Sequence, residues 1–362
     1  MARIVIDARE YSTSTGRYIN KVIENLEPID TQNEYLILLK DNDYNQASFT
    51  NPKFTKVLCP YPEFSLSEQL GFALQLYKLK ADLVHFGMTQ QPLLYLKRSV
   101  TTVHDLTTAR FTNPDTNKYV FLAKHQIYKV VIRYAARKSK KVIVPSNYVK
   151  DDLINFSKVR QKKVIVTYEA ADPIKETAKP INSLAGKPFI MYIGRPMPHK
   201  NLWRLIEAFD SLKGLYPDLE LVLAGKIDRN YSDIERRVSS NNISGVVFTD
   251  YISEGELRWL YENCRAYIFP SLSEGFGLPG LEAMVHGAPV VSSNATCLPE
   301  IYGDAAHYFD PLDKQSIANA IADVLGNEKL REKLIANGKR QAANYSWHRT
   351  ATETLAVYNG AL

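Results

Sequence analysis

The sequence SLSEGFGLPGLEAMVHGA, residues 271–288, contains two glutamates with three glycines between them. Glu274 and Glu282 are eight residues apart, and Pro279 fits the first turn of a helix, where its missing N–H costs no hydrogen bond. Glycines let backbone amides approach a ligand closely, and a helix N-terminus favours an anion. The stretch predicts a loop that enters a helix and binds a group such as a diphosphate. A purely structural alternative explains Glu282 as an early-helix charge, but explains Glu274 and the glycines poorly.

Two cations lie upstream, in FIMYIGRPMPHKN at residues 189–201. Arg195 follows a predicted strand, and Lys200 comes just before the next predicted helix. A transferase that releases a nucleoside diphosphate must stabilise negative charge, which preorganised Arg and Lys side chains do as well as metal ions. Solvated surface charges are the alternative. The Asp-x-Asp at residues 41–43 lies in a predicted polar turn, so we expect no metal site and no cofactor.

Short apolar runs alternate with amphipathic stretches along the whole chain, which is typical of parallel sheets flanked by helices. The alternation stops in the Pro- and Lys-rich residues 171–187, as expected for an inter-domain linker. We therefore predict an α/β protein with two doubly wound, Rossmann-like domains, at residues 1–175 and 176–345, facing each other across a cleft. The last helix, within residues 346–362, is expected to cross back onto the first domain.

These motifs together resemble the retaining glycosyltransferases of family 4, which have the GT-B fold. The resemblance rests on Gly194-Arg195 with Lys200-Asn201, on the spacing from Glu274 to Glu282, and on Leu298-Pro299-Glu300. It implies that Arg195 and Lys200 hold the donor diphosphate, that Glu274 contacts the sugar hydroxyls and that Glu282 contacts the ribose. It also implies an N-terminal acceptor domain and a C-terminal donor domain.

The resemblance extends to further donor residues. Gly275, Phe276, Gly277 and Leu278 would give contacts to sugar and phosphate, and Asp250 borders the expected nucleobase site. In the N-terminal half, Gly16 lies in a loop, residues 13–18, that links a predicted strand to a helix. A glycine there brings amides near a phosphate, although an ordinary glycine turn is the alternative.

The acceptor side is expected at the ends of predicted strands, where open α/β sheets bind ligands. His104 ends Thr-Thr-Val-His, where the resemblance implies a hydrogen bond to the reacting sugar, and Asp105 would orient it. Ser146 matches a cleft-lining position of the family, and His85 ends another predicted strand. For both histidines, a purely structural role is the alternative. We assign no task to Glu169, because its segment departs from the family's commoner form.

The net charge of +6 is unevenly distributed. Residues 1–185 contain 27 Lys or Arg and 18 Asp or Glu, so a nucleic-acid protein that is basic throughout is not expected. Four basic residues recur at helical spacing and suggest either a solvated face or a patch for an anionic membrane or lipid diphosphate, with Val130 on the buried side. They are Lys129, Arg133, Arg137 and Lys141. Three scattered cysteines and the lack of a bilayer-spanning run indicate a cytoplasmic protein, peripheral at most.

The expected function is transfer of a hexose, with retention, from a nucleotide diphosphate sugar to a glycan or lipid-linked saccharide during cell-surface polysaccharide assembly. Retention is implied by the resemblance, which includes polysaccharide and O-antigen mannosyltransferases and so favours mannose from GDP-mannose. A UDP-hexose or a dTDP-deoxysugar is the alternative donor. A nucleotide-sugar epimerase of the same fold would need no acceptor. A non-catalytic sugar-nucleotide-binding protein would be expected to have lost at least one of the four charged donor residues, and all four are present.

Overall fold

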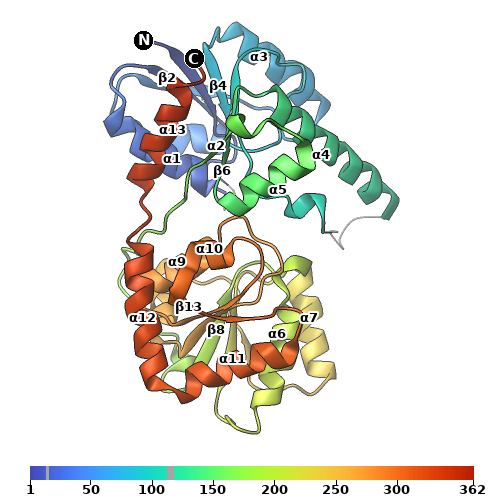
Figure 1. The fold of residues 1–362 in the computed structure, drawn as a ribbon, viewed down its shortest axis with the longest axis vertical. Helices are drawn as coiled ribbons and strands as arrows, with labels where there is room; N and C mark the ends of the chain where they lie inside the picture. Colours follow the sequence, from blue (N-terminus) through green and yellow to red (C-terminus); the bar gives the residue numbers. More distant parts are fainter. Residues whose placement is uncertain (14–15, 112–117) are drawn as a thin grey trace. The chain divides into compact units, whose positions relative to one another are not determined.

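The computed structural model describes residues 1–13, 16–111 and 118–362, which form two compact units. The N-terminal domain contains Met1–Arg110, the described residues up to Glu169, and Ser346–Leu362. The C-terminal domain contains Phe111 and Ala170–Tyr345. In each domain, helices pack on a fully parallel sheet (Figure 1). No helix in the described ranges is long and apolar enough to cross a membrane.

The N-terminal sheet has seven parallel strands in the order β3-β2-β1-β4-β5-β6-β7. One of its inner strands is buried from Ile4 to Ile6, as expected where helices cover both faces of a sheet. The strands are β1 (Arg3–Asp7), β2 (Glu34–Leu39), β3 (Phe54–Leu58), β4 (Leu83–Phe86), β5 (Ser99–Thr102), β6 (Lys141–Val144) and β7 (Val164–Val166). The helices are α1 (Arg17–Ile29), α2 (Asp41–Gln46), η1 (Glu68–Phe72), α3 (Ala73–Lys78), η2 (Thr107–Ala109), α4 (Lys118–Lys138), α5 (Asn147–Ser157), η3 (Gln161–Lys163) and α13 (Trp347–Asn359).

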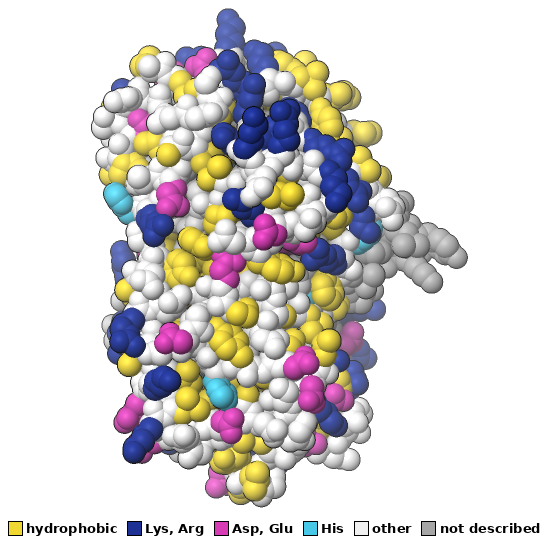
Figure 2. Space-filling view, in the orientation of Figure 1, with side chains coloured by type: hydrophobic (Ala, Val, Ile, Leu, Met, Phe, Trp, Pro, Cys, Tyr) yellow, Lys and Arg dark blue, Asp and Glu magenta, His cyan; other side chains and the backbone are white. Residues whose placement is uncertain are grey.

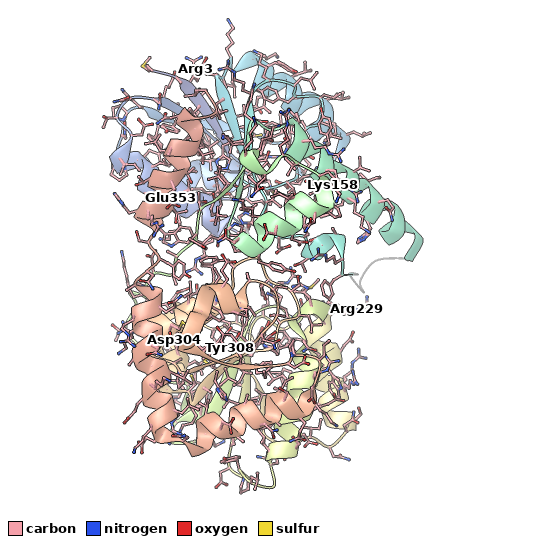
Figure 3. The ribbon with its side chains drawn as sticks, in the orientation of Figure 1. Arg3, Lys158, Arg229, Asp304, Tyr308 and Glu353 are labelled. Carbon is pink, nitrogen blue, oxygen red and sulfur yellow. The ribbon has the colours of Figure 1, made fainter. Side chains whose placement is uncertain are left out.

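The C-terminal sheet has six parallel strands in the order β10-β9-β8-β11-β12-β13. The strands are β8 (Phe189–Ile193), β9 (Glu220–Ala224), β10 (Val246–Phe248), β11 (Ala266–Phe269), β12 (Val290–Ser293) and β13 (Ala306–Phe309). The helices are η4 (Asn182–Leu184), η5 (Pro198–Lys200), α6 (Leu202–Leu212), α7 (Arg229–Ser240), α8 (Glu254–Asn263), α9 (Leu278–Val285), α10 (Leu298–Tyr302), η6 (Gly303–Ala305), α11 (Lys314–Gly326) and α12 (Glu328–Ala342). Asn337 of α12 donates to the carboxylate of Asp304, at 3.1 Å, and so ties α12 to the turn before β13. Figure 3 labels Asp304 of this turn and Tyr308 of β13.

The last helix, α13, packs against α1 in the N-terminal domain (Figure 1). The hydroxyl of Thr350 donates to the carbonyl oxygen of Tyr168 at 2.6 Å. The buried ring of Tyr358 lies 6.5 Å from that of Tyr35, and Trp347 lies 6.5 Å from Tyr18. These contacts make the end of the chain part of the N-terminal core.

One local expectation was wrong, and a second holds with a different helical geometry. The predicted polar turn at residues 41–43 is the first turn of α2, where Asp41 and Asp43 favour a helix start because they complement its dipole. The predicted helix at residues 66–79 begins as a wider π turn, η1, before α3 continues it. This turn carries Glu68, which is buried and pairs with Arg9 at 3.0 Å.

The expected basic patch on α4 is also largely engaged inside the domain. Arg133 and Arg137 donate to the carbonyl oxygens of Phe156 and Ser157, at 3.3 and 2.6 Å. Both carbonyls belong to the last turn of α5, where cations stabilise the unpaired end of a helix. Lys141 lies in β6 and not on the helix, and it donates to a carbonyl of η3 at 3.3 Å. Three of the four basic residues therefore hold neighbouring elements together. Val130, expected on the buried side, is exposed.

Candidate active site

Lys200 and Glu274 meet at the carboxyl ends of β8 and β11. These strands are neighbours, so the loops that follow them emerge at the same edge of the sheet. Lys200, in the first loop, places its Nζ 2.6 Å from Oε1 of Glu274, in the second. The two side chains retain 21% and 12% of their exposure, so the pair is partly buried yet open to a ligand.

Asn201 fixes the loop that carries Lys200. Its backbone is left-handed, with φ of 61°, a conformation that Asn tolerates better than most residues. Its buried amide donates to the carbonyl oxygens of Pro270 and Pro311, at 3.1 and 2.8 Å. These bonds join the β8–α6 loop to the ends of β11 and β13. Asn201 is therefore a positioning residue.

Glu274 is held from the other side by the residues before α10. Its backbone N–H donates to the hydroxyl of Thr296 at 3.2 Å, and Cys297 donates its thiol to the Glu274 carbonyl at 3.4 Å. Gly275 and Phe276 are buried directly after it. The loop is thus built before a ligand arrives, which is how a preorganised charged site works.

The glycines that follow serve packing as well as ligand approach. Gly277 is the N-cap of α9 with φ of 90°, and Leu278 begins the helix. The buried hydroxyl of Tyr302 donates to the Gly277 carbonyl at 2.5 Å. A Cβ on Gly280 would lie 2.3 Å from the same hydroxyl. Close approach of Tyr302 therefore requires glycine at both positions.

Three further donor-side residues have separate partners. Arg195 is 76% exposed at its side chain, and its nearest ionic partner is Asp228, at 3.6 Å. Glu282, one turn into α9, accepts from the Tyr261 hydroxyl at 3.4 Å. Asp250 is exposed and accepts from the backbone of residue 227 at 2.8 Å. Arg195 is thus an exposed cation with one long ionic contact, in contrast to Lys200, which is partly buried and closely paired.

In the N-terminal domain, His104 follows β5 and is bound on both ring nitrogens. Nε2 lies 3.0 Å from the carbonyl oxygen of Gly87, and Nδ1 lies 3.3 Å from Oε1 of the buried Glu169. Two acceptors favour the doubly protonated ring. Burial alone would lower the pKa of His104, but the hydrogen bond and charge of Glu169 outweigh it and raise the pKa above 6.5.

Replacing Glu169 by Gln is expected to lower the pKa of His104, because the main raising interaction is removed. The raised pKa means that the folded protein binds the His104 proton more tightly than the unfolded chain does. The pair with Glu169 therefore stabilises the fold fully below pH 6.5, and this contribution is lost as pH rises through the folded pKa. The variant should therefore lose more stability at pH 5.5 than at pH 8.5. Urea unfolding at both values measures the difference, and NMR titration measures the pKa. An equal loss of stability at both pH values would contradict the pairing of His104 with Glu169.

His85 provides an internal control for that titration. It is fully buried, with its ring nitrogens 2.7 Å from the Tyr358 hydroxyl and 2.9 Å from that of Thr102. Burial lowers its pKa to about 3, so its signal should stay constant. The expectation that His85 faces the acceptor was wrong, because the ring is enclosed by β5 and α13. Ser146 is likewise buried, and its hydroxyl caps α5 by accepting from Val149 N–H at 3.2 Å.

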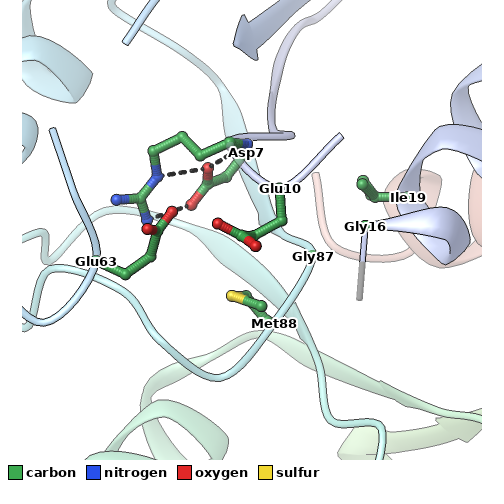
Figure 4. A pocket seen from close by; sticks show the side chains of 8 residues that line it. Asp7, Glu10, Gly16, Ile19, Glu63, Gly87 and Met88 are labelled. Carbon is green, nitrogen blue, oxygen red and sulfur yellow. Dashed lines mark hydrogen bonds and ion pairs between the residues drawn. The ribbon is translucent and has the colours of Figure 1, made fainter. Parts of the chain in front are cut away.

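A pocket of about 560 Å³ opens beside His104 and Asp105 in the N-terminal domain. Two carboxylates of this pocket share one cation: Lys40 Nζ lies 2.7 Å from Glu10 and 2.9 Å from Glu63. Figure 4 shows Glu10 and Glu63 directed toward one another. Burial opposes the charge of Glu10, but Lys40 outweighs it and lowers the pKa. The pocket is lined by Glu10, Glu63, Phe64, Met88, Thr89, Gln90, His104, Asp105, Thr108 and Tyr128.

Gly16 lies beside this pocket and lines a smaller one with Glu10 and Gly87 (Figure 4). Its N–H donates to the hydroxyl of Thr13 at 3.0 Å, so this amide already has a partner. A Cβ here would lie 1.5 Å from the Glu10 carbonyl oxygen, which explains why glycine is required. Ser14 and Thr15 of the same loop lie outside the described residues.

Several site residues carry no distinctive sequence signal. Glu169, Asp228 and Lys40 are isolated charges that only the fold brings to His104, Arg195 and Glu10. Glu169 follows a predicted strand, which is the one sequence hint of its place. Within the described ranges, no three His, Cys, Asp or Glu side chains gather as a metal site.

Comparison with known proteins identifies the family. The description "Glycosyltransferase Family 4" matches residues 40–174, and "Glycosyl transferases group 1" matches residues 174–341. The chain is 30% identical over 306 residues to O-antigen chain mannosyltransferase B of Escherichia coli, covering 80% of this chain and 76% of that protein.

Solved structures agree on the fold. A sucrose-phosphate synthase from Thermosynechococcus elongatus superposes with a TM-score of 0.78 at 18% identity, covering 99% of this chain and 98% of that one. HepE of Anabaena, solved with UDP and glucose, gives a TM-score of 0.74 at 18% identity, with both chains fully covered. The resemblance drawn from the motifs is confirmed: this chain belongs to glycosyltransferase family 4, with the two Rossmann-like domains of the GT-B fold.

Proposed function

We propose that the chain transfers a hexose, with retention of anomeric configuration and without a metal ion, from a nucleotide diphosphate sugar to a glycan or lipid-linked saccharide. The observation that carries this proposal is the ion pair of Lys200 and Glu274 at the start of α9. A donor sugar diphosphate has an anionic end for the lysine and hydroxyl groups for the carboxylate. Both side chains therefore have complementary partners in one ligand.

In the proposed reaction, Lys200 and the exposed Arg195 stabilise charge on the departing diphosphate, the task that a metal ion performs elsewhere. Glu274 accepts hydrogen bonds from the sugar and is not free to act as a covalent nucleophile. The departing phosphate then takes the acceptor's proton as the acceptor attacks the same face. Glu282 and Asp250 contact the nucleoside part, and His104 donates to the reacting sugar.

The pocket beside His104 supports a polyhydroxylated acceptor. The carboxylates of Glu10, Glu63 and Asp105 accept hydrogen bonds from hydroxyl groups. Oε1 of Glu63 is buried with no hydrogen-bond partner in the part of the chain that the structure describes. A buried polar atom of this kind is costly unless a ligand or water satisfies it. An acceptor hydroxyl would satisfy it.

The proposed donor sugar and the proposed cellular role are supported by the similar proteins. The Escherichia coli protein is an O-antigen chain mannosyltransferase, which supports mannose as the transferred sugar and a role in cell-surface polysaccharide assembly. The donor that we propose is GDP-mannose. HepE, solved with UDP and glucose, supports a nucleotide-sugar donor in general. We accordingly propose that the chain works in the cytoplasm, at the inner face of the membrane.

The proposal is tested by thermal shift with GDP-mannose, UDP-glucose and dTDP-glucose in the presence of EDTA. A donor at 100 times its Kd adds about 2.7 kcal/mol to stability, a shift of several degrees. We expect GDP-mannose to give the largest shift, and NMR of the product to show the donor's anomeric configuration. No shift with any donor would contradict the proposal. Isomerisation of a donor without acceptor would indicate an epimerase instead.

A further inference from the structure

Exposed leucines gather on one surface of the N-terminal domain. Leu66, Leu70 and Leu74 recur every four residues, Leu66 just before η1 and the other two in η1 and α3. Leu94 and Leu96 lie in the loop after β4. These five residues, the leucine surface, are between 54% and 83% exposed. Single exposed leucines need no explanation, but a contiguous group marks an interaction site.

Hydrogen bonds show that the two segments are neighbours. The side chain of Gln69 accepts from Leu93 N–H at 2.8 Å. The hydroxyl of Tyr77 donates to the Leu94 carbonyl at 3.0 Å and accepts from Leu96 N–H at 2.9 Å. The loop is thus fixed on the helix, so the leucines form one rigid surface without any rearrangement.

Basic residues border this surface. Lys78 and Lys80 end the helix, and Lys97 and Arg98 follow the loop, all of them exposed. Residues 64–80 and 93–98 contain one carboxylate, that of Glu68, which is buried against Arg9. Figure 2 shows apolar and basic side chains next to one another on this domain. The surface therefore offers apolar contact with a positive rim.

We propose that the leucine surface binds the interfacial region of an anionic lipid bilayer. Interfacial helices combine such an apolar face with Lys and Arg, and each cation near an anionic surface adds about 1 kcal/mol. The leucines enter the acyl boundary, while Lys78, Lys80 and Lys97 meet lipid phosphates; Arg98 is bound to the Leu362 carbonyl. This contact differs from the expected basic face of α4, because Arg133 and Arg137 are bound to α5.

The charge pattern favours lipid over a second copy of the chain. A two-fold contact through this surface would place the cations of one copy beside those of the other. Residues 64–80 and 93–98 offer no exposed carboxylate to neutralise them, and the exposed Asp82 that follows already accepts from Arg3 N–H at 2.8 Å. An anionic bilayer neutralises the three lysines of the border, so it is the complementary partner.

The test is co-sedimentation of the full chain with vesicles of phosphatidylcholine, alone or mixed with phosphatidylglycerol. We expect binding to the mixed vesicles that weakens as salt rises. The variant Leu66→Ser/Leu70→Ser/Leu74→Ser should lose at least about tenfold in partitioning, equivalent to about 1.4 kcal/mol. The matched control Leu215→Ser/Leu312→Ser removes leucines of similar exposure, 74% and 67%, from the other domain and should bind as before.

Three outcomes would overturn the proposal: no preference for phosphatidylglycerol, equal loss in both variants, or unchanged binding in the triple variant. Light scattering without lipid measures whether the chain instead binds a second copy of itself. A dimer that becomes monomeric only in the triple variant would assign the surface to a second copy and exclude the bilayer. Circular dichroism confirms that each variant is folded. Sugar transfer to a short soluble acceptor is a separate readout, so loss of vesicle binding and failure of the proposed function remain distinguishable.

Discussion

Replacing Lys200 by Met is expected to lower the turnover number of sugar transfer by about 100- to 1,000-fold, which is the usual cost of removing one preorganised group that stabilises transition-state charge. The reason is its position. Lys200 is held by the η5 turn and the buried amide of Asn201, so its charge needs no rearrangement when the diphosphate departs. Steady-state kinetics with the donor identified by thermal shift measure the effect. The change should fall on kcat more than on KM.

Stability must be separated from chemistry in this variant, because Lys200 is the partner of Glu274. Removing only the lysine leaves a carboxylate that is 12% exposed without its cation, which we expect to cost about 1–2 kcal/mol of stability. The variant Lys200→Met/Glu274→Gln removes both charges. It should recover most of that stability while remaining as inactive as Lys200→Met. Activity that returns together with stability would show that the pair is structural.

A matched control is the ion pair of Lys187 and Glu220, which lies in the same domain with a distance of 2.7 Å. Lys187→Met removes one lysine from a Lys–Glu pair at a more exposed place, where such pairs contribute less than about 1 kcal/mol. Its kcat should equal that of the wild type. A comparable loss of activity in this control would mean that general charge, and not the site of Lys200, determines turnover.

Much of this site was predictable from the sequence because its residues lie in contiguous motifs. The spacing from Glu274 to Glu282 places one residue before a helix and the other inside it, and α9 begins at Leu278 as that spacing requires. Strand alternation predicts that loops after neighbouring strands meet. The sequence motifs around Lys200 and Glu274 therefore predicted where these two residues lie in the fold.

The partners of those residues were not predictable, because they depend on burial and on side chains distant in sequence. Glu169 binds His104 across 65 positions, and Lys40 binds Glu10 across 30. His85 and Ser146 have the residue types of a polar site, yet both are enclosed in the core and satisfied there. Composition and spacing contain no information on such enclosure, which only packing decides.

Adding one methyl group at Gly280 is expected to have the second largest effect, this time on folding. The new Cβ would lie 2.3 Å from the Tyr302 hydroxyl and 2.4 Å from its ring, both closer than atoms can approach. Tyr302 is fully buried and bound to the Gly277 carbonyl, so it has little room to move. We expect Gly280→Ala to lower stability by about 2–3 kcal/mol, as overpacking of a core does. Urea unfolding measures this value.

The control is Gly326→Ala, at the end of helix α11 in the same domain, where the nearest atom to a new Cβ is 3.6 Å away. That change should be neutral or slightly stabilising, because alanine is the better helix former. Gly280→Ala/Tyr302→Leu should be less destabilised than the sum of its single variants, since the second change removes the clashing ring. Strict additivity would contradict the steric argument. If the methyl group instead displaces the start of α9, donor binding will weaken along with stability, and the effect on Kd will show that Tyr302 positions the loop of Glu274.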